Sequence, residues 1–357
     1  MIEGLDTVLE DTGQPGLPEL RWLLKELLDG RNAEGRLIES QTLQPRALGV
    51  FRLRFAINGQ TRSVVVKRLK PESARRNEMV VKRWLPAIGL SSNGPPLLGS
   101  VAERSGICIW HVYDDLGQHE LDPSQLDRKS VRVAIEVIAR MHTRFAGHPL
   151  LGEVRLSGGD LGIHFYESNV RDAIYALDAC KPAEQQMQLR DHLLQRLHKL
   201  RDELPLRAQA LYEWGGPETL LHGDLWTINV FVLPTANGLD ARLIDWESAG
   251  VGPASYDVST FLLRFPPRHR SWVLDTYAME VARAGWRLPP LQELNFLYET
   301  AEYARFVNHI IWPAIALAQD HASWGWDVLA EVDQWFEDME PVLPCECEGS
   351  ATSLTRS

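Results

Sequence analysis

The sequence has few cysteines and no long apolar run, and each absence argues against a class of protein. Its four cysteines are too few and too irregularly placed for a disulfide framework, and Cys345 and Cys347 lack a second ligand pair for zinc, so we expect reduced thiols. No stretch of about 18 uninterrupted apolar residues occurs, and the first residues lack the basic and apolar regions of a signal peptide. We therefore expect a cytoplasmic protein that has no membrane partner.

Blocks of lysine or arginine are missing as well. The formal net charge is -11 at pH 7, so the sequence offers no electrostatic footprint to nucleic acid or to an anionic membrane, and we expect neither as a partner. The acidic balance is compatible with a cationic substrate. The sequence leaves the oligomeric state open.

The strongest strand signal lies between residues 51 and 67. Apolar residues alternate from 51 to 57, Asn58-Gly59 supplies a tight turn, and residues 63–67 continue as a second apolar run. This pattern predicts a β-hairpin. Residues 20–28 instead have helical apolar spacing, which predicts a short helix near the start of the chain.

Helical periodicity dominates the chain beyond residue 113. Residues 131–145 and 184–204 each carry an apolar stripe, which predicts one core helix and one helix packed at the surface. Residues 158–162 are rich in glycine, but no strand precedes them and no Lys-Ser/Thr pair follows. They therefore predict a turn between helices rather than a phosphate-binding loop.

Residues 221–247 carry the polar groups on which the functional prediction depends. Asp224 and Asn229 have the spacing of the H-x-D-x-x-x-x-N catalytic loop of kinases, and Asp245 follows the apolar pair Leu243-Ile244, as a metal-binding aspartate follows a strand. Phosphoryl transfer needs a carboxylate that orients and deprotonates the attacking hydroxyl, and hard oxygen ligands that hold Mg²⁺ against the phosphates. The three polar side chains therefore predict a metal-phosphate site.

This part of the sequence resembles the aminoglycoside phosphotransferase and choline kinase family of small-molecule kinases. The resemblance is carried by His222-Gly223-Asp224-Leu225-Trp226, by Asn229 and by Ile244-Asp245-Trp246-Glu247. It implies ATP and Mg²⁺ as cofactors, Asp224 as the catalytic residue, and Asn229 and Asp245 as metal ligands. Gly223 stands where protein kinases usually have an arginine that pairs with a phosphorylated loop, which argues against activity switched by phosphorylation.

The resemblance also implies which residues bind the nucleotide phosphates. Lys67 ends a run, 64–67, that is similar to the V-A-I-K strand motif, although a strand lysine alone is more often a solvated edge charge. Glu78 lies in the next helical segment, 72–85, and would pair with Lys67 to hold it toward the phosphates. The alternative is an exposed glutamate that pairs locally with Lys82.

A hinge is expected after the apolar run 107–113, which Asp114-Asp115-Leu116-Gly117 breaks. In related kinases the backbone of this hinge binds adenine, so the resemblance places the nucleotide near Asp114 and Leu116.

The loop expected to cover the phosphates, residues 41–50, departs from the family pattern. It contains Gly49 but no G-x-G-x-x-G run. Phosphate contacts there would have to come from backbone amides or from Arg46.

Substrate-binding residues are expected in the aromatic-rich, helical last third of the chain. Glu299 and Glu302, with nearby aromatic rings, would bind an ammonium group by charge and cation-π contact. The stronger alternative is that the aromatics are core residues and that Glu302 pairs with Arg305 on the helix surface.

Together these observations predict an α+β, two-lobed protein-kinase-like fold, with an N-terminal antiparallel sheet plus one helix and a mainly helical C-terminal lobe. The expected parts are a lead-in segment (1–34), a nucleotide-binding lobe (35–112), a catalytic and substrate-binding lobe (113–341) and a tail (342–357). We expect transfer of the ATP γ-phosphate to a hydroxyl of a small molecule, such as an aminoglycoside, an amino-sugar, a sugar or an amino-alcohol. The alternatives are a catalytically silent binding protein and a protein kinase.

Overall fold

Two compact units make up the chain, and each contains two separate stretches of sequence. The first unit consists of Met1–Gly159 and Thr219–Val251, and the second of Asp160–Glu218 and Gly252–Ser357. The computed structural model describes residues 2–4, 14–29, 35–43, 49–125 and 127–343. The lobes expected from the sequence, 35–112 and 113–341, are continuous stretches and do not correspond to these two units. Their boundaries stay predictions.

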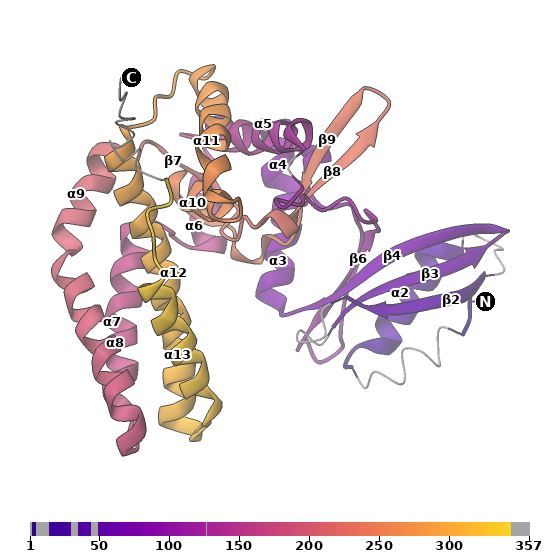
Figure 1. The fold of residues 1–357 in the computed structure, drawn as a ribbon. Helices are drawn as coiled ribbons and strands as arrows, with labels where there is room; N and C mark the ends of the chain where they lie inside the picture. Colours follow the sequence, from indigo (N-terminus) through magenta and orange to yellow (C-terminus); the bar gives the residue numbers. More distant parts are fainter. Residues whose placement is uncertain (1, 5–13, 30–34, 44–48, 126, 344–357) are drawn as a thin grey trace, which may run out of the picture. The chain divides into compact units, whose positions relative to one another are not determined.

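A six-stranded sheet forms the first part of the first unit (Figure 1). Its strand order is β1-β2-β3-β4-β6-β5, and all neighbours are antiparallel except β1 and β2. The strands are β1 (Ile2–Glu3), β2 (Gly35–Thr42), β3 (Val50–Ile57), β4 (Gln60–Leu69), β5 (Leu97–Ala102) and β6 (Ile109–Asp114).

The predicted hairpin is confirmed as β3 and β4. Asn58 and Gly59 form its two-residue turn with φ values of 50° and 77°, the left-handed backbone that a tight hairpin turn requires. The register pairs Val50 with Lys67 and Ile57 with Gln60. Lys67 therefore lies near the end of β4, next to the strand that begins after the expected phosphate loop.

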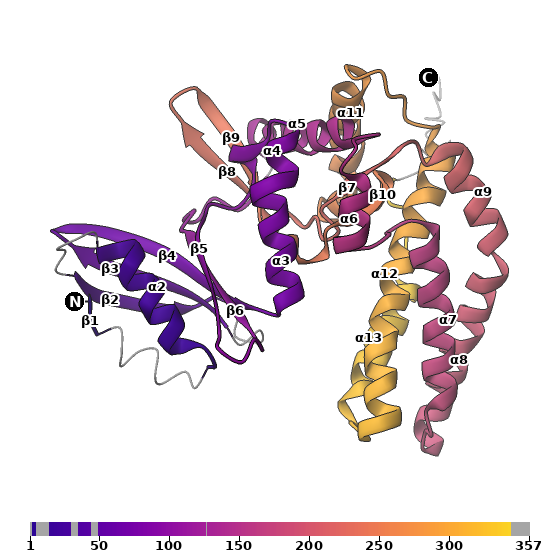
Figure 2. The same cartoon turned by 180° about the vertical axis from the view of Figure 1, so that it is seen from behind.

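The early helix predicted at residues 20–28 is α2 (Leu17–Asp29), and it covers one face of this sheet (Figures 1 and 2). Leu20 and Leu24 are fully buried in the same apolar cluster as Phe55 and Trp110 from the strands. Each buried leucine contributes about 2 kcal/mol relative to an exposed one. The helix therefore packs into the apolar core of the sheet.

The rest of the first unit places the motif residues around the sheet. The helical segment predicted at 72–85 is confirmed as α3 (Pro71–Met79), which continues through a π-helical turn (Val80–Trp84) into α4 (Leu85–Ala87), and a short 3-10 turn follows (Ser91–Asn93). The remaining elements are α5 (Arg128–Phe145), α6 (Leu151–Gly158), β8 (Val230–Thr235) and β9 (Gly238–Leu243), with 3-10 turns at Thr227–Asn229 and Trp246–Ser248. Two short strands, β7 (Glu218–Leu221) and β10 (Gly250–Pro253), lie at the boundaries of the unit. β8 pairs with β9, and β7 with β10.

The second unit is helical. Its elements are α7 (Ile163–Ala179), α8 (Glu184–Asp202), α9 (Leu204–Trp214), α10 (Ser255–Leu263), α11 (Pro267–Ala282), α12 (Leu291–Asp320) and α13 (Trp324–Glu337). Both views show α7, α8, α12 and α13 side by side (Figures 1 and 2). The polar helix predicted at 184–204 is confirmed as α8, whose Leu193, Leu197 and Leu200 enter the bundle core.

An antiparallel sheet with one covering helix, followed by a mainly helical chain, agrees with the predicted fold class. Within the described residues, no helix combines the length and the apolar character needed to cross a bilayer.

Candidate active site

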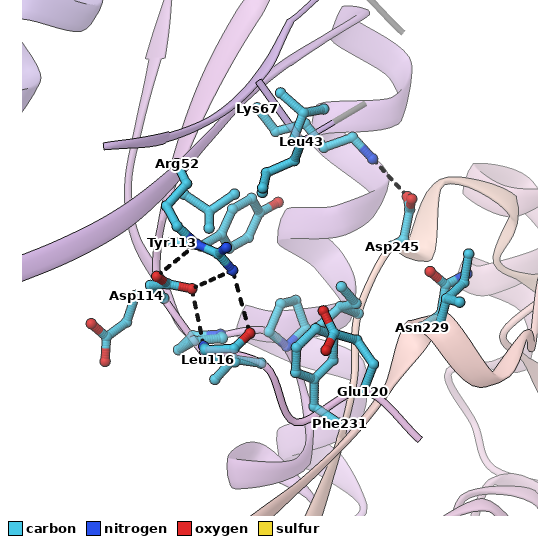
Figure 3. A pocket seen from close by; sticks show the side chains of 18 of the residues that line it. Leu43, Arg52, Lys67, Tyr113, Asp114, Leu116, Glu120, Asn229, Phe231 and Asp245 are labelled. Atoms are coloured by element: carbon cyan, nitrogen blue, oxygen red, sulfur yellow. Dashed lines mark hydrogen bonds and ion pairs between the residues drawn. The ribbon is translucent and has the colours of Figure 1, made fainter. Parts of the chain in front are cut away.

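A cavity of about 640 Å³ lies within the first unit (Figure 3). Its walls come from β3, β4 and β6, from the segment that follows β6, and from residues 228–245. Five of the residues predicted to bind nucleotide or metal line it: Lys67, Asp114, Leu116, Asn229 and Asp245. The fold thus brings together groups that lie far apart in the sequence.

Lys67 forms two ion pairs at one side of the cavity. Its Nζ lies 2.8 Å from Asp245 Oδ1 and 2.5 Å from Glu247 Oε1. Burial opposes the charge on Lys67, but the two carboxylates outweigh burial and raise its pKa. The lysine therefore stays charged and holds the predicted metal ligand Asp245 in place.

The predicted pair between Lys67 and Glu78 is not formed. Glu78 Oε2 instead lies 2.7 Å from Lys82 Nζ, which is the local alternative, and Glu78 Oε1 lies 3.4 Å from Nε2 of the buried His111. Burial would raise the pKa of Glu78, but the hydrogen bonds from Lys82 and Ser100 lower it. The physical reason for the difference is that Lys67 has two closer carboxylates, Asp245 and Glu247.

His111 links Glu78 to the wall of the cavity. Its Nδ1 lies 2.8 Å from the hydroxyl of Tyr113, and Tyr113 lines the cavity next to the hinge. Burial lowers the pKa of His111 to about 4, against the attraction of Glu78. The imidazole is therefore neutral near pH 7, and it lies between the carboxylate of Glu78 and the hydroxyl of Tyr113.

Lowering the pH from 7 to 5 is expected to reduce the free energy of unfolding by about 2 kcal/mol through His111. The pKa of His111 falls from 6.5 in the unfolded chain to about 4 in the folded protein. This part of the free energy of unfolding is therefore fully present above pH 6.5 and is lost as the pH falls toward 4. Urea denaturation of the wild type and of His111→Gln at both pH values measures this difference. An equal loss of stability in the two proteins would show that His111 does not cause it.

The backbone at Asp245 is held in an uncommon conformation. Asp245 has φ 64° and ψ 61°, a left-handed geometry that costs about 1 kcal/mol or more for a residue with a side chain. The N–H of the buried Trp246 donates to Asn77 Oδ1 at 3.3 Å, and Arg76 donates to the carbonyl of Glu247. These contacts from α3 fix the loop and orient the Asp245 carboxylate.

Asp224 and Asn229 are joined by hydrogen bonds. Asn229 Nδ2 donates to the carbonyl of Asp224 at 2.9 Å and contacts its Oδ2 at 3.4 Å. His222 Nε2 lies 2.7 Å from the carbonyl of Ile244, which ties this segment to the strand before Asp245. Because the amide nitrogen of Asn229 faces Asp224, the amide oxygen of Asn229 can act as a ligand to a cation.

The donor set suits Mg²⁺. Asp245 and Glu247 offer carboxylates and Asn229 offers an amide oxygen, and Asn229 and Asp245 line the same cavity. Mg²⁺ prefers such hard oxygen ligands and is usually held by one or two carboxylates together with substrate phosphates. The residues present therefore fit the implied metal.

Gly223 allows a close approach between two backbone segments. Its φ is 82°, and a Cβ built on it would lie 1.9 Å from the carbonyl oxygen of Ser248. No side chain fits between these two backbone segments. Close backbone approach therefore explains why glycine, not arginine, precedes Asp224.

Gly223→Ala is expected to destabilise the fold more than Gly59→Ala, by about 1–3 kcal/mol, because overpacking adds to backbone strain. Gly59 is a matched control, since its φ is 77° and nothing lies within 4 Å of its added Cβ. Urea denaturation of both variants gives the comparison. Equal costs would mean that the contact with Ser248 relaxes without penalty.

The segment after β6 is tied to the sheet. Asp115 accepts a hydrogen bond from Ser63 Oγ at 2.6 Å, and its Oδ2 lies 2.9 Å from Arg52 Nε. The N–H of Asp114 donates to Pro96, while the N–H of Leu116 has no hydrogen-bond partner in the described ranges. A free backbone donor at Leu116 is compatible with the expected contact to a nucleotide base.

The expected phosphate loop is described only in part. Arg46 lies outside the described residues, so its predicted role is untested. Gly49, with φ 131°, accepts a hydrogen bond from the N–H of Arg68 at 2.8 Å, and Leu43 N–H donates to the carbonyl of Val50 at 3.0 Å. These bonds close the base of the loop.

Two acidic residues were missed by the sequence reasoning. Glu247 belongs to the motif that carries the family resemblance, but the sequence analysis predicts no role for it. In the structure it forms an ion pair with Lys67. Glu120 lines the cavity below Asp245 in Figure 3, and the backbone beside Glu120 pairs with that of Phe231. The motif could have indicated Glu247, whereas no sequence pattern marks Glu120.

Glu299 and Glu302, which were predicted to bind substrate, each pair with an arginine, and the substrate role stays a prediction. Glu302 is 4% exposed and accepts hydrogen bonds from Ser259 Oγ at 2.6 Å and Arg305 at 2.5 Å. Glu299 Oε1 accepts from the buried Arg207 at 2.6 Å. Each carboxylate therefore has an arginine partner within the helical unit, and Glu302 is buried whereas the side chain of Glu299 is 37% exposed.

Comparison with known proteins identifies a family. A family model described as the phosphotransferase enzyme family matches residues 42–294, more than half of the chain. No curated protein matches the sequence.

Several solved structures share the fold at low sequence identity. A spectinomycin phosphotransferase in complex with ADP and spectinomycin has a TM-score of 0.56 and 12% identity, over 91% of this chain and 95% of that one. A macrolide 2'-phosphotransferase from Brachybacterium faecium has a TM-score of 0.53 and 15% identity, over 88% and 97%. A Plasmodium vivax ethanolamine kinase has a TM-score of 0.51 and 12% identity, over 84% and 82%. The predicted kinase-like fold class is thus confirmed.

Proposed function

Because this chain belongs to the phosphotransferase enzyme family, we propose that it transfers the γ-phosphoryl group of ATP to a hydroxyl of a small molecule, with Mg²⁺ as the metal. The observation that carries the proposal is one cavity lined by Lys67, Asn229, Asp245 and the segment after β6. Phosphoryl transfer depends mainly on positioning and charge stabilisation, and these groups provide both.

Each residue has a distinct part in the proposed reaction. Asp224 orients the acceptor hydroxyl and takes its proton as the new bond from oxygen to the γ-phosphorus forms, while the bond from the γ-phosphorus to the bridging oxygen breaks and ADP leaves. Lys67 binds the phosphate oxygens once it exchanges its carboxylate partners for them. Asn229 and Asp245 would hold Mg²⁺, which would supply positive charge to offset the negative charge on the phosphate oxygens.

The nucleotide base would lie beside the segment after β6. The free N–H of Leu116 donates to the base, and the backbone at Asp114 gives the neighbouring contact. The carboxylate of Glu120 lines the same cavity and is available to accept hydrogen bonds from the ribose hydroxyls. We keep the cytoplasm as the expected compartment, since this proposal requires ATP.

The acceptor belongs to a class rather than to one compound. The similar structures are named as a spectinomycin phosphotransferase, a macrolide 2'-phosphotransferase and an ethanolamine kinase. We therefore propose a hydroxylated antibiotic, an amino-sugar or an amino-alcohol as the acceptor of this chain. The arginine partners of Glu299 and Glu302 remove the electrostatic reason to favour a cationic acceptor over a neutral one.

A panel of acceptors tests the proposal. Purified protein with ATP and Mg²⁺ is incubated with aminoglycosides, macrolides, sugars and amino-alcohols, and products are analysed by mass spectrometry. We expect at least one acceptor to gain a single phosphoryl group only when all components are present. Phosphorylation of protein substrates alone would support a protein kinase instead.

A further inference from the structure

A second cavity, of about 240 Å³, lies within the helical unit. Its walls come from the end of α9, from α11 and the loop that follows it, and from the first turns of α10 and α12. Most of its lining is apolar or aromatic and includes Trp214, Pro217, Val258, Trp286, Leu294 and Leu297. Water is poorly held by such walls, whereas an apolar cavity of about 150 Å³ can bind benzene. The cavity therefore has room for a substituted aromatic ring.

Two buried residues of this cavity carry hydroxyl groups, and the hydroxyl of Ser255 lacks a hydrogen-bond partner among the described residues. Ser255 is 9% exposed, and its Oγ forms no hydrogen bond with any residue that the structure describes. Tyr298 is 1% exposed and also lines the cavity, and burial raises the pKa of its phenol. Each buried polar group left without a partner costs roughly 1–3 kcal/mol. A bound molecule with its own hydroxyl would recover part of this cost.

The opening of the cavity has a cationic side chain. Arg287 lines the cavity and is exposed, and it forms no ion pair with any of the described residues. A guanidinium is well shaped to bind a carboxylate through two parallel hydrogen bonds. The cavity thus combines apolar walls, buried hydroxyls and a cation at its opening.

We propose that this cavity is a second small-molecule site, and that it binds a hydroxylated aromatic carboxylate. The ring fills the apolar part, its hydroxyl bonds with Ser255 and Tyr298, and its carboxylate binds Arg287. The volume is well below that of the first cavity, and it excludes a nucleotide as the occupant. The site lies wholly within the helical unit and is independent of the proposed transfer reaction.

Titration calorimetry on the full chain tests this site, with 4-hydroxybenzoate as the probe. Benzoate and 4-hydroxybenzyl alcohol are the matched comparisons, since each lacks one polar group. We expect 4-hydroxybenzoate to bind more tightly than either. Tyr298→Phe and Ser255→Ala together should weaken its binding about tenfold and leave benzoate unchanged, because they remove only hydrogen bonds. Arg287→Gln should weaken both acids and leave the alcohol unchanged.

Binding of an ATP analogue to every variant serves as the control for folding. The proposal is overturned if the wild type binds none of the three compounds, if ATP displaces the probe, or if the variants do not change its affinity. Equal affinity for the acid and the alcohol would contradict the role of Arg287 and the carboxylate class. None of these results depends on whether the chain transfers phosphate.

Discussion

Replacing Asp224 by asparagine is expected to lower kcat by about two to four orders of magnitude, while nucleotide affinity stays nearly unchanged. Asparagine keeps the shape of the side chain but cannot take the proton of the acceptor hydroxyl. The hydrogen bond from Asn229 to the carbonyl of Asp224 involves only backbone of residue 224, so the local fold should persist. Steady-state kinetics and calorimetry on the same preparation separate the two quantities.

The control for Asp224→Asn removes one negative charge elsewhere. Asp172 lies on α7, where its carboxylate pairs with the neighbouring Arg171 at 2.9 Å on the surface. Asp172→Asn should leave both kcat and affinity near their wild-type values. If Asp224→Asn retained full activity, Asp224 would not be the base.

Replacing Asp245 is expected to weaken Mg²⁺-dependent nucleotide binding by about 100-fold or more, since even groups that only support metal ligands cost 10–100-fold when removed. Lys67 would keep Glu247 as a partner, so its charge stays compensated in the variant. Calorimetric titration with ATP, in the presence and absence of Mg²⁺, measures the effect.

Two variants separate the metal role of Asp245 from its backbone role. Asparagine tolerates the left-handed conformation of this position better than alanine does. Loss of the Mg²⁺ effect in both Asp245→Asn and Asp245→Ala indicates lost metal ligation. If only the alanine variant were impaired, the backbone conformation would be the cause, and an unchanged metal dependence in both would place the metal elsewhere.

Features set by neighbouring residues could be predicted from the sequence. The Asn58-Gly59 turn works because both residues adopt positive φ, and this preference is local. The leucine stripe of α8 has helical spacing, and Leu193, Leu197 and Leu200 are buried as that spacing requires. The motif around Asp224 and Asn229 was recognisable because its residue types and their spacing match the pattern of the family.

Features set by competition between distant groups could not be predicted. Glu78 has several possible partners, and only the folded geometry shows that Lys67 lies closer to Asp245 and Glu247. Glu78 lies on α3, and the nearby buried His111 lies on β6. His111 is the residue opposite Lys67 in the register of β4 and β6.

The two glutamates of α12 show the same limit. Glu299 pairs with Arg207, which lies 92 residues away in the sequence. A local sequence pattern cannot predict a partner at that separation. Glu302 combines the predicted contact to Arg305 with hydrogen bonds from α10. The burial of that pair depends on how the helices pack, which the spacing of charges does not encode.

Single-turnover transfer from γ-labelled ATP tests the central claim most directly. Wild-type protein and Asp224→Asn, each in excess over nucleotide, are mixed with Mg²⁺ and an acceptor pool, and the label is followed from ATP to product. The account predicts that label moves to a small-molecule hydroxyl with the wild type, while the variant binds ATP equally well and transfers almost none. Tight nucleotide binding by the wild type without transfer to any acceptor would contradict the account and identify a catalytically silent protein.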